Sequence, residues 1–176
     1  MPLTKRAVVE AASTILDEFG LADLSMRRVA DALGVQPGAL YYHVPNKQSL
    51  LSAVADEIVD SIPAVTSLGA WAWGYRNALL AHRDAAELVL SSRALGLGSI
   101  DPTASARALL PEDTPPAVLA TFEHFILGST MHDQTRAQLA DLGVLHGFDA
   151  TVAERAFADG IEILARGSGI NIDNLA

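Results

Sequence analysis

The sequence contains no cysteine, which excludes disulfide bonds and thiolate metal sites. It has no apolar run approaching the ~20 residues that a membrane-spanning helix needs. Polar residues interrupt the N-terminal stretch MPLTKRAVVEAAS, where a secretory signal peptide would have its apolar region. We therefore expect a cytoplasmic protein with no membrane partner.

Basic residues are also scarce, because the 176 residues include 12 Lys and Arg against 21 Asp and Glu, for a net charge of −9. This balance suits a polyanionic partner only if the positive charges gather on one face. Five of them, Lys5, Arg6, Arg27, Arg28 and Lys47, precede residue 48. An anionic partner is therefore expected at the N-terminal part of the chain.

Half of the residues are hydrophobic, which suffices for one compact body or two small domains. The apolar residues recur at three-to-four spacing and no segment alternates as a strand does, so we predict an all-α fold. Thr114 is expected to cap a long helix that begins at Pro115. The expected helices cover residues 4–19, 25–33, 37–43, 47–62, 68–82, 83–93, 103–110, 115–142 and 150–166, with an irregular tail after residue 167.

The stretch LSMRRVADALGVQPGALYYHVPNK, residues 24–47, has the signals of two short helices joined by a tight turn. Ser25 is a good N-cap, and Gly34 stands where the first helix needs a left-handed residue at its end. Pro37 suits the first turn of the second helix, which must stop before Pro45 because proline disfavours helical backbone in the preceding residue. This pattern predicts a helix-turn-helix.

The second of these helices turns Leu40 and Val44 to the core by its spacing, which leaves two tyrosines and a histidine on the remaining surface. Small residues beside them would permit close approach to a DNA major groove, where tyrosine and imidazole groups reach phosphates or base edges. The pattern favours DNA binding. A helical hairpin whose tyrosines merely cover a neighbouring element would have the same signals.

The residues from Thr4 to Asp60 resemble the N-terminal domain of the TetR family of transcriptional regulators, with LGVQPGALYYHVPNK matching its recognition helix and the start of the next helix. The resemblance implies that Lys47 clamps a phosphate. Pro37 and Ala39 depart from residues that relatives carry, so base specificity does not carry over. The implied DNA-binding residues are Arg27, Arg28, Gln36, Pro37, Gly38, Ala39, Tyr41, Tyr42, His43 and Lys47.

Three segments of the second half, RNALLAHRDAAELVLSSR, FEHFILGSTMHDQ and AFADGIEILARG, resemble the ligand-binding and dimerisation domain of the tetracycline-repressor-like branch of that family. The resulting division of the chain is a DNA-binding domain at 1–47, a connecting helix at 48–62 and a ligand-binding and dimerisation domain at 63–176.

Enzyme chemistry has little support, because Ser91 and Ser92 lie in no nucleophile elbow and no glycine-rich phosphate loop follows a strand. His124 and His132 lie about 12 Å apart along one helix, too far to ligate one ion unaided. We expect no metal and no cofactor. Aromatic residues could instead line an apolar cavity for a planar ligand. The candidate ligand-binding residues are Trp71, Tyr75, Val89, Ser92, Arg93, Phe122, His124, Phe125, Met131 and His132.

Tetracycline repressors hold a magnesium ion, chelated by the drug, through a histidine and a carboxylate, with a threonine nearby. By the resemblance, Val89 takes the histidine position, Ser92 the threonine and His132 the carboxylate, whereas Arg93 and His124 match. A hard cation prefers anionic oxygen ligands. These exchanges imply that magnesium–tetracycline is not the ligand.

The expected function is that of a transcriptional repressor released from a palindromic operator by a small-molecule effector. Its expected partners are double-stranded operator DNA, the effector and a second copy of the chain. The helices at 115–142 and 150–166 should pair with their two-fold mates, and Gly160 should allow a close approach. The alternative is an all-α enzyme or ligand carrier whose helix-turn-helix is only scaffold.

Overall fold

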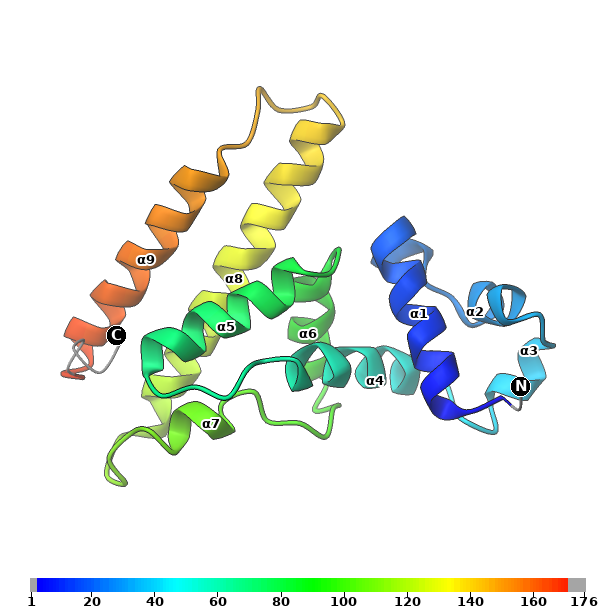
Figure 1. Cartoon of the computed structure of the whole chain (residues 1–176), viewed down its shortest axis with the longest axis horizontal. Coiled ribbons are helices and arrows are strands. Elements are labelled where there is room, and N and C mark those ends of the chain that lie inside the picture. The colour runs from blue at the N-terminus through cyan, green and yellow to red at the C-terminus, as the bar shows by residue number, and fades with distance from the viewer. Residues whose placement is uncertain (1–2, 171–176) are drawn as a thin grey trace.

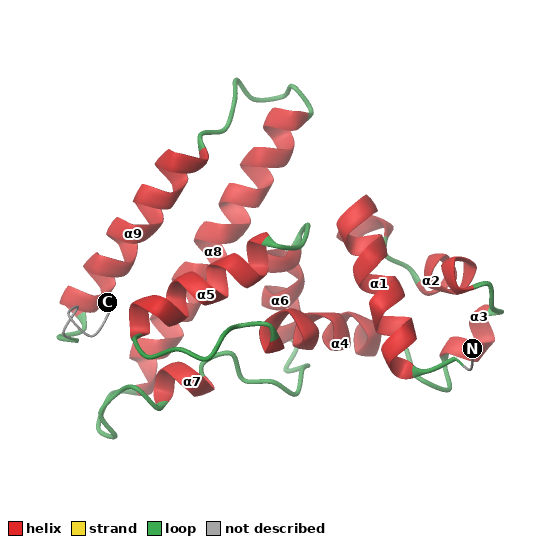
Figure 2. Ribbon diagram, viewed as in Figure 1, coloured by secondary structure: helices red, strands yellow, loops and turns green. Residues whose placement is uncertain are grey.

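The computed structural model describes residues 3–170, which contain helices and loops but no strand (Figure 1, Figure 2). The all-α prediction is confirmed. The elements are α1 (Lys5–Phe19), η1 (Leu21–Asp23), α2 (Met26–Leu33), α3 (Pro37–Leu40), α4 (Lys47–Asp60), α5 (Leu68–Leu80), α6 (Ala85–Ala94), α7 (Ala104–Arg107), α8 (Pro116–Asp141) and α9 (Ala150–Gly167). The last part of the predicted tail, 171–176, lies outside the described residues. None of the helices within 3–170 combines the length and apolar character needed to cross a membrane.

The caps of the first helices are those that the sequence predicts. Thr4 Oγ1 accepts from the N–H of Ala7 at 3.1 Å, and Ser25 Oγ accepts from the N–H of Arg28 at 3.2 Å. Gly34 has a φ of 65°, the left-handed conformation that ends α2. These are bonds between near neighbours, so local sequence fixes the boundaries of α1 and α2.

Several predicted boundaries were wrong: the helices predicted at 47–62, 68–82, 83–93 and 103–110 are found at 47–60, 68–80, 85–94 and 104–107. Two further differences have a clear physical reason. α3 ends at Leu40 instead of reaching His43, and a turn follows in which the N–H groups of His43 and Val44 both donate to the Leu40 carbonyl at 2.9 Å. The long helix α8 has Pro115 and not Thr114 as its N-cap, with no capping side chain. Proline has no N–H to satisfy, so this helix start has fewer donors that need a cap.

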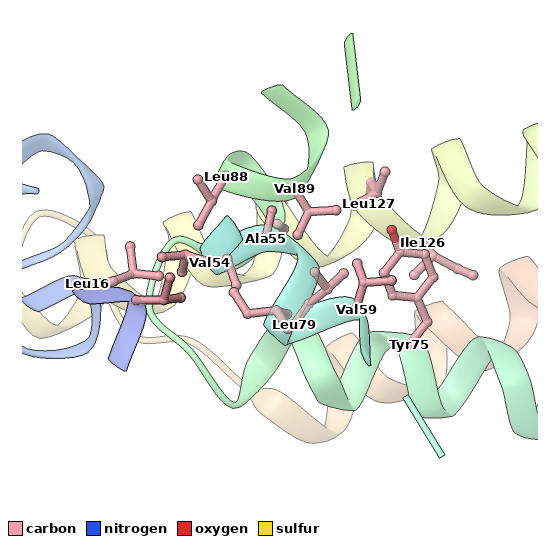
Figure 3. Packing of buried hydrophobic residues seen from close by; sticks show 14 of the residues in the cluster. Leu16, Val54, Ala55, Val59, Tyr75, Leu79, Leu88, Val89, Ile126 and Leu127 are labelled. Carbon is pink, nitrogen blue, oxygen red and sulfur yellow. The ribbon is translucent and has the colours of Figure 1, made fainter. Parts of the chain in front are cut away.

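The helix α4 joins the body formed by α1–α3 to the body formed by α5–α9 (Figure 1). Figure 3 shows buried side chains that run from Leu16 of α1, through Val54 and Val59 of α4, to Tyr75 of α5 and Ile126 of α8. The core is therefore continuous between the two bodies.

The helices α8 and α9 form an antiparallel pair (Figure 1). A Cβ on Gly160 of α9 would lie 2.1 Å from the ring of Phe125 on α8, so only glycine fits there. The Phe125 ring stacks on Phe157 with centroids 5.6 Å apart, and Phe157 meets Trp73 edge-on at 4.9 Å. The close approach that the sequence predicts at Gly160 is made within one chain.

Candidate functional site

The segment 36–43, which we call the α3 surface, carries most of the predicted DNA-binding side chains. Leu40 and Val44 are buried, as predicted, and hold the segment on the core. Tyr41 is 52% exposed and Tyr42 is 91% exposed. The other predicted residues of this surface are also exposed or half-buried: Gln36, Pro37, Gly38, Ala39 and His43. The predicted residues 36–43 therefore lie in one short segment whose side chains are accessible.

The two arginines at the start of α2 have different surroundings. Arg27 is exposed, with the Asp31 carboxylate 3.9 Å away. Arg28 lies over the Phe19 ring at 3.8 Å and pairs with Asp23 at 2.6 Å. Arg27 can turn to a phosphate at little cost, whereas Arg28 already braces α2 against α1 and η1. The exposed Lys47 opens α4 beside the α3 surface.

Half of the predicted ligand-binding residues are buried in the core of the second body. The buried members are Trp71, Tyr75, Val89, Ser92 and Phe122. The indole N–H of Trp71 donates to the carbonyl of Pro102 at 2.8 Å. Trp71 is thus a satisfied core residue that anchors the loop before α7.

A polar cluster lies at the edge of this core, formed by the buried Tyr75 and Glu123 and the exposed Arg93. Arg93 pairs with Glu123, with 3.3 Å between Nη2 and Oε2. The hydroxyls of Tyr75 and Ser92 are buried without a hydrogen-bond partner among residues 3–170. Sequence reasoning missed Glu123, although an acid three residues before the apolar Ile126 on a helical face was an available signal. The unsatisfied buried hydroxyl of Tyr75 makes this cluster a candidate for binding a polar ligand group.

The protonation of this cluster is shifted by its surroundings. Burial raises the pKa of Glu123 above its ordinary value, and the positive charge of Arg93 opposes that shift. Burial, together with the charge of Glu123, raises the pKa of Tyr75. The phenol therefore stays neutral and can donate a hydrogen bond.

The remaining four candidates all belong to α8. His124 and His132 are exposed, and Nδ1 of His132 lies 3.2 Å from the Asp133 carboxylate. Phe125 and His132 line an open cavity of about 490 Å³ between α8 and α9. Met131 is half-buried. The structure thus does not bring the predicted ligand residues together in one site.

The turn between α5 and α6 makes a joint with the N-terminal body, which we call the Asp84 joint. The Asp84 carboxylate accepts from the N–H of Leu21 at 2.8 Å and from Nε2 of Gln138 on α8 at 2.5 Å. Asp17 of α1 accepts from the N–H of Arg83 at 3.3 Å. Asp84 is the only non-glycine residue within 3–170 that has a positive φ, at 55°. These bonds offset the cost of that conformation.

A second link connects α4 to the loop after α6. The Asp56 carboxylate accepts from the N–H of Ser99 at 2.9 Å, from its hydroxyl at 2.7 Å and from the N–H of Ile100 at 3.2 Å. Gly98 has a φ of 100°, and a Cβ there would lie 3.0 Å from Asp56 Oδ1. Hydrogen bonds therefore connect the start of α6 to η1, and the loop after α6 to α4.

The comparisons with known proteins agree with this arrangement. Residues 8–54 match the family described as bacterial regulatory proteins, tetR family. The crystal structure of BioQ from Mycobacterium smegmatis is similar with a TM-score of 0.81 and 38% sequence identity, over 95% of this chain and 98% of that one. The chain belongs to the TetR family. A BioQ structure with its natural double-stranded DNA operator is also similar, with a TM-score of 0.76 and 37% identity over 97% and 100% of the chains.

Two other TetR-family relatives resemble nearly the whole chain. The tetracycline repressor protein class D of Escherichia coli is 29% identical over 98% of this chain and 92% of the repressor. ActR from Streptomyces coelicolor in complex with (S)-DNPA has a TM-score of 0.72 and 26% identity over 96% and 98% of the chains. The chain is therefore a helix-turn-helix transcriptional regulator and not an enzyme, which removes the enzyme alternative.

Proposed function

We propose that the protein is a homodimeric repressor that binds a palindromic operator through the α3 surface and leaves it when a small molecule binds the α5–α9 body. The exposure of Tyr41 and Tyr42 on a segment anchored by buried Leu40 and Val44 carries the proposal. A rigid surface of small and aromatic residues suits a major groove. The related protein BioQ has been solved with its DNA operator, which supports operator binding by the present chain.

Operator binding tests the proposal. DNA from upstream of the chain's own gene is titrated with the protein, and Tyr41→Ala and Arg27→Ala should each weaken binding about tenfold or more, because each removes a groove contact. Arg27→Ala should also lower the salt dependence by about one counterion if its contact is a phosphate. Arg107→Ala removes a charge from α7, far along the chain, and serves as the control. Wild-type affinity in both test variants would show that the DNA-binding surface is not the α3 surface.

Release by an effector is supported by the unsatisfied hydroxyls of Tyr75 and Ser92 in the core and by the ActR complex with (S)-DNPA. We propose an effector other than magnesium–tetracycline. Val89 is apolar and only 1% exposed, at the position where the resemblance puts a histidine in tetracycline repressors. His132 is exposed and already beside Asp133.

Tetracycline with magnesium tests this part. Titration of the protein–operator complex should leave the operator bound, because the exchanged residues offer the cation too few anionic oxygens. Fluorescence anisotropy of labelled operator follows the release. Release at low micromolar drug would show that the proposed exclusion is wrong.

A further inference from the structure

We propose a binding site for neutral carbonyl compounds in the open cavity between α5, α8 and α9, beside the Asp84 joint. The cavity has a volume of about 530 Å³, within the usual range for small-molecule sites. Its apolar wall is formed by Leu80, Ala137, Leu142, Phe148 and Ala153. It shares no residue with the buried polar cluster, so it is a separate site.

Arg76 is the feature that points to a ligand, because it lines this cavity yet is only 2% exposed. Its Nη2 donates to Asp133 at 2.7 Å, and the guanidinium lies over the Phe157 ring at 4.6 Å. The Nε and Nη1 groups are buried, and no acceptor reaches them from any part of the chain that the structure describes. Leaving such donors unsatisfied costs free energy that an acceptor oxygen at the cavity floor would recover.

The other charges of the lining select against an anion. Asp133 already neutralises Arg76, and the exposed carboxylates of Asp141 and Glu154 outnumber the remaining cation, Arg83. A carboxylate ligand would meet three carboxylates against two cations, Arg76 and Arg83. A ketone, lactone or amide oxygen accepts from the guanidinium without adding charge, and its apolar body fits the apolar wall.

An occupant of this cavity would touch the side chains that hold the Asp84 joint. Gln134 Nε2 donates to the carbonyls of Leu79 at 3.0 Å and His82 at 2.8 Å, and Gln138 donates to Asp84. Both glutamines line the cavity. Displacing them would loosen the turn that bonds to the N-terminal body. The regulatory role of the occupant rests on the proposed function, whereas its binding does not.

Benzophenone is a suitable probe, because it is a neutral diaryl ketone that, when irradiated, forms a bond at a nearby C–H group. In calorimetry on the full chain it should bind at least tenfold more tightly than diphenylmethane, which lacks the carbonyl, and than 4-benzoylbenzoate, which adds a carboxylate. Irradiation followed by peptide mass spectrometry should label Leu80 or residues 137–153. No binding, equal affinity for the ketone and the hydrocarbon, or labelling confined to α6 would overturn the site.

Two variants locate the contact. Arg76→Lys keeps the charge beside Asp133 but loses the unsatisfied donors, so the preference for benzophenone over diphenylmethane should fall towards one. Ala137→Trp should fill the cavity and abolish binding of both compounds. Ala117→Trp places the same bulk at an exposed position of α8 outside the cavity and should bind as wild type. The comparison of ligands on the wild-type chain decides the proposal even if Arg76→Lys fails to fold.

Operator titration then tests the regulatory role. Benzophenone should weaken operator binding of the wild type at least tenfold and leave that of Ala137→Trp unchanged. Binding of the ketone with no change in operator affinity would overturn the regulatory role. A chain that binds the ketone but never binds operator would contradict the proposed function and leave the site standing.

Discussion

Glu123 is a carboxyl group placed among apolar neighbours, with Phe122, Ile126 and Leu127 buried beside it on α8. Burial raises its pKa above the ordinary value of 4.5, while Arg93 acts in the opposite direction. In the unfolded chain the same group ionises near its ordinary value. Between the two pKa values the folded chain therefore holds a proton that the unfolded chain has lost.

The free energy of unfolding should fall as pH rises from about 4.5 through the raised pKa of Glu123, because stability declines where the folded state binds more protons. Glu123→Gln has no such proton, so its free energy of unfolding should lack this part of the decline with pH. Denaturant unfolding at several pH values on both sides of the interval measures the difference. Glu87→Gln, at an exposed position of α6, controls for the loss of one acid. An unchanged slope in Glu123→Gln would contradict the shift.

At the scale of elements, the contact between α8 and α9 depends on the absence of a side chain at Gly160. Phe125 fills the space that a Cβ would occupy, and its ring continues into the stack with Phe157. The Phe125 ring therefore packs directly on the backbone of α9 at Gly160, a contact that we call the Phe125 wedge. Such contacts tolerate little added volume.

Gly160→Ala should destabilise the protein by about 1–3 kcal/mol, because the new methyl group overpacks the contact with Phe125. Gly128→Ala is the matched control on α8. A Cβ at Gly128 meets nothing within 4 Å, so alanine should be neutral or stabilising by up to ~1 kcal/mol through its higher helix propensity. Thermal or denaturant unfolding measures both. Phe125→Leu should restore part of the loss in Gly160→Ala, and equal effects of the two alanines would contradict the wedge.

The boundaries of the elements could be predicted wherever a near neighbour sets them, as Ser25 and Gly34 do for α2. Contacts between distant residues could not. Asp84 bonds to Leu21, 63 positions away, and to Gln138, 54 positions away. No periodicity of the sequence predicts such a hydrogen bond, because only the tertiary fold brings these groups together. The same holds for Arg76 and Asp133, 57 positions apart.

At the scale of the whole molecule, α9 and the loop before it expose large apolar side chains. Val144 is 66% exposed, Val152 52% and Ile163 67%. Exposed apolar side chains of this size are typical of an interface. Pairing of two chains there would present two α3 surfaces, as a palindromic operator needs, with half-sites about 34 Å apart.

The protein should be a dimer at micromolar concentration in light scattering. Ile163→Asp should shift it towards monomer by placing a charge in the interface. Leu95→Asp is the control, because Leu95 is similarly exposed, at 60%, but follows α6. Circular dichroism confirms that each variant is folded. A monomeric wild type, or equal effects of the two substitutions, would contradict the dimer.

The two links, at the start of α6 and in the loop after it, constrain how a movement of this helix could displace the α3 surface. Asp84 lies at its start and bonds to Leu21, and Asp56 of α4 bonds to the loop that follows it. A slide of α6 along its own axis would move both hydrogen-bonded links in the same direction and translate the N-terminal body. A tilt would carry them in opposite directions and apply a torque. On an operator whose half-sites have a fixed angular phase, a small torque on each α3 surface would misalign the pair, so under the proposed function we expect a tilt of α6, rather than a slide, to accompany release of DNA.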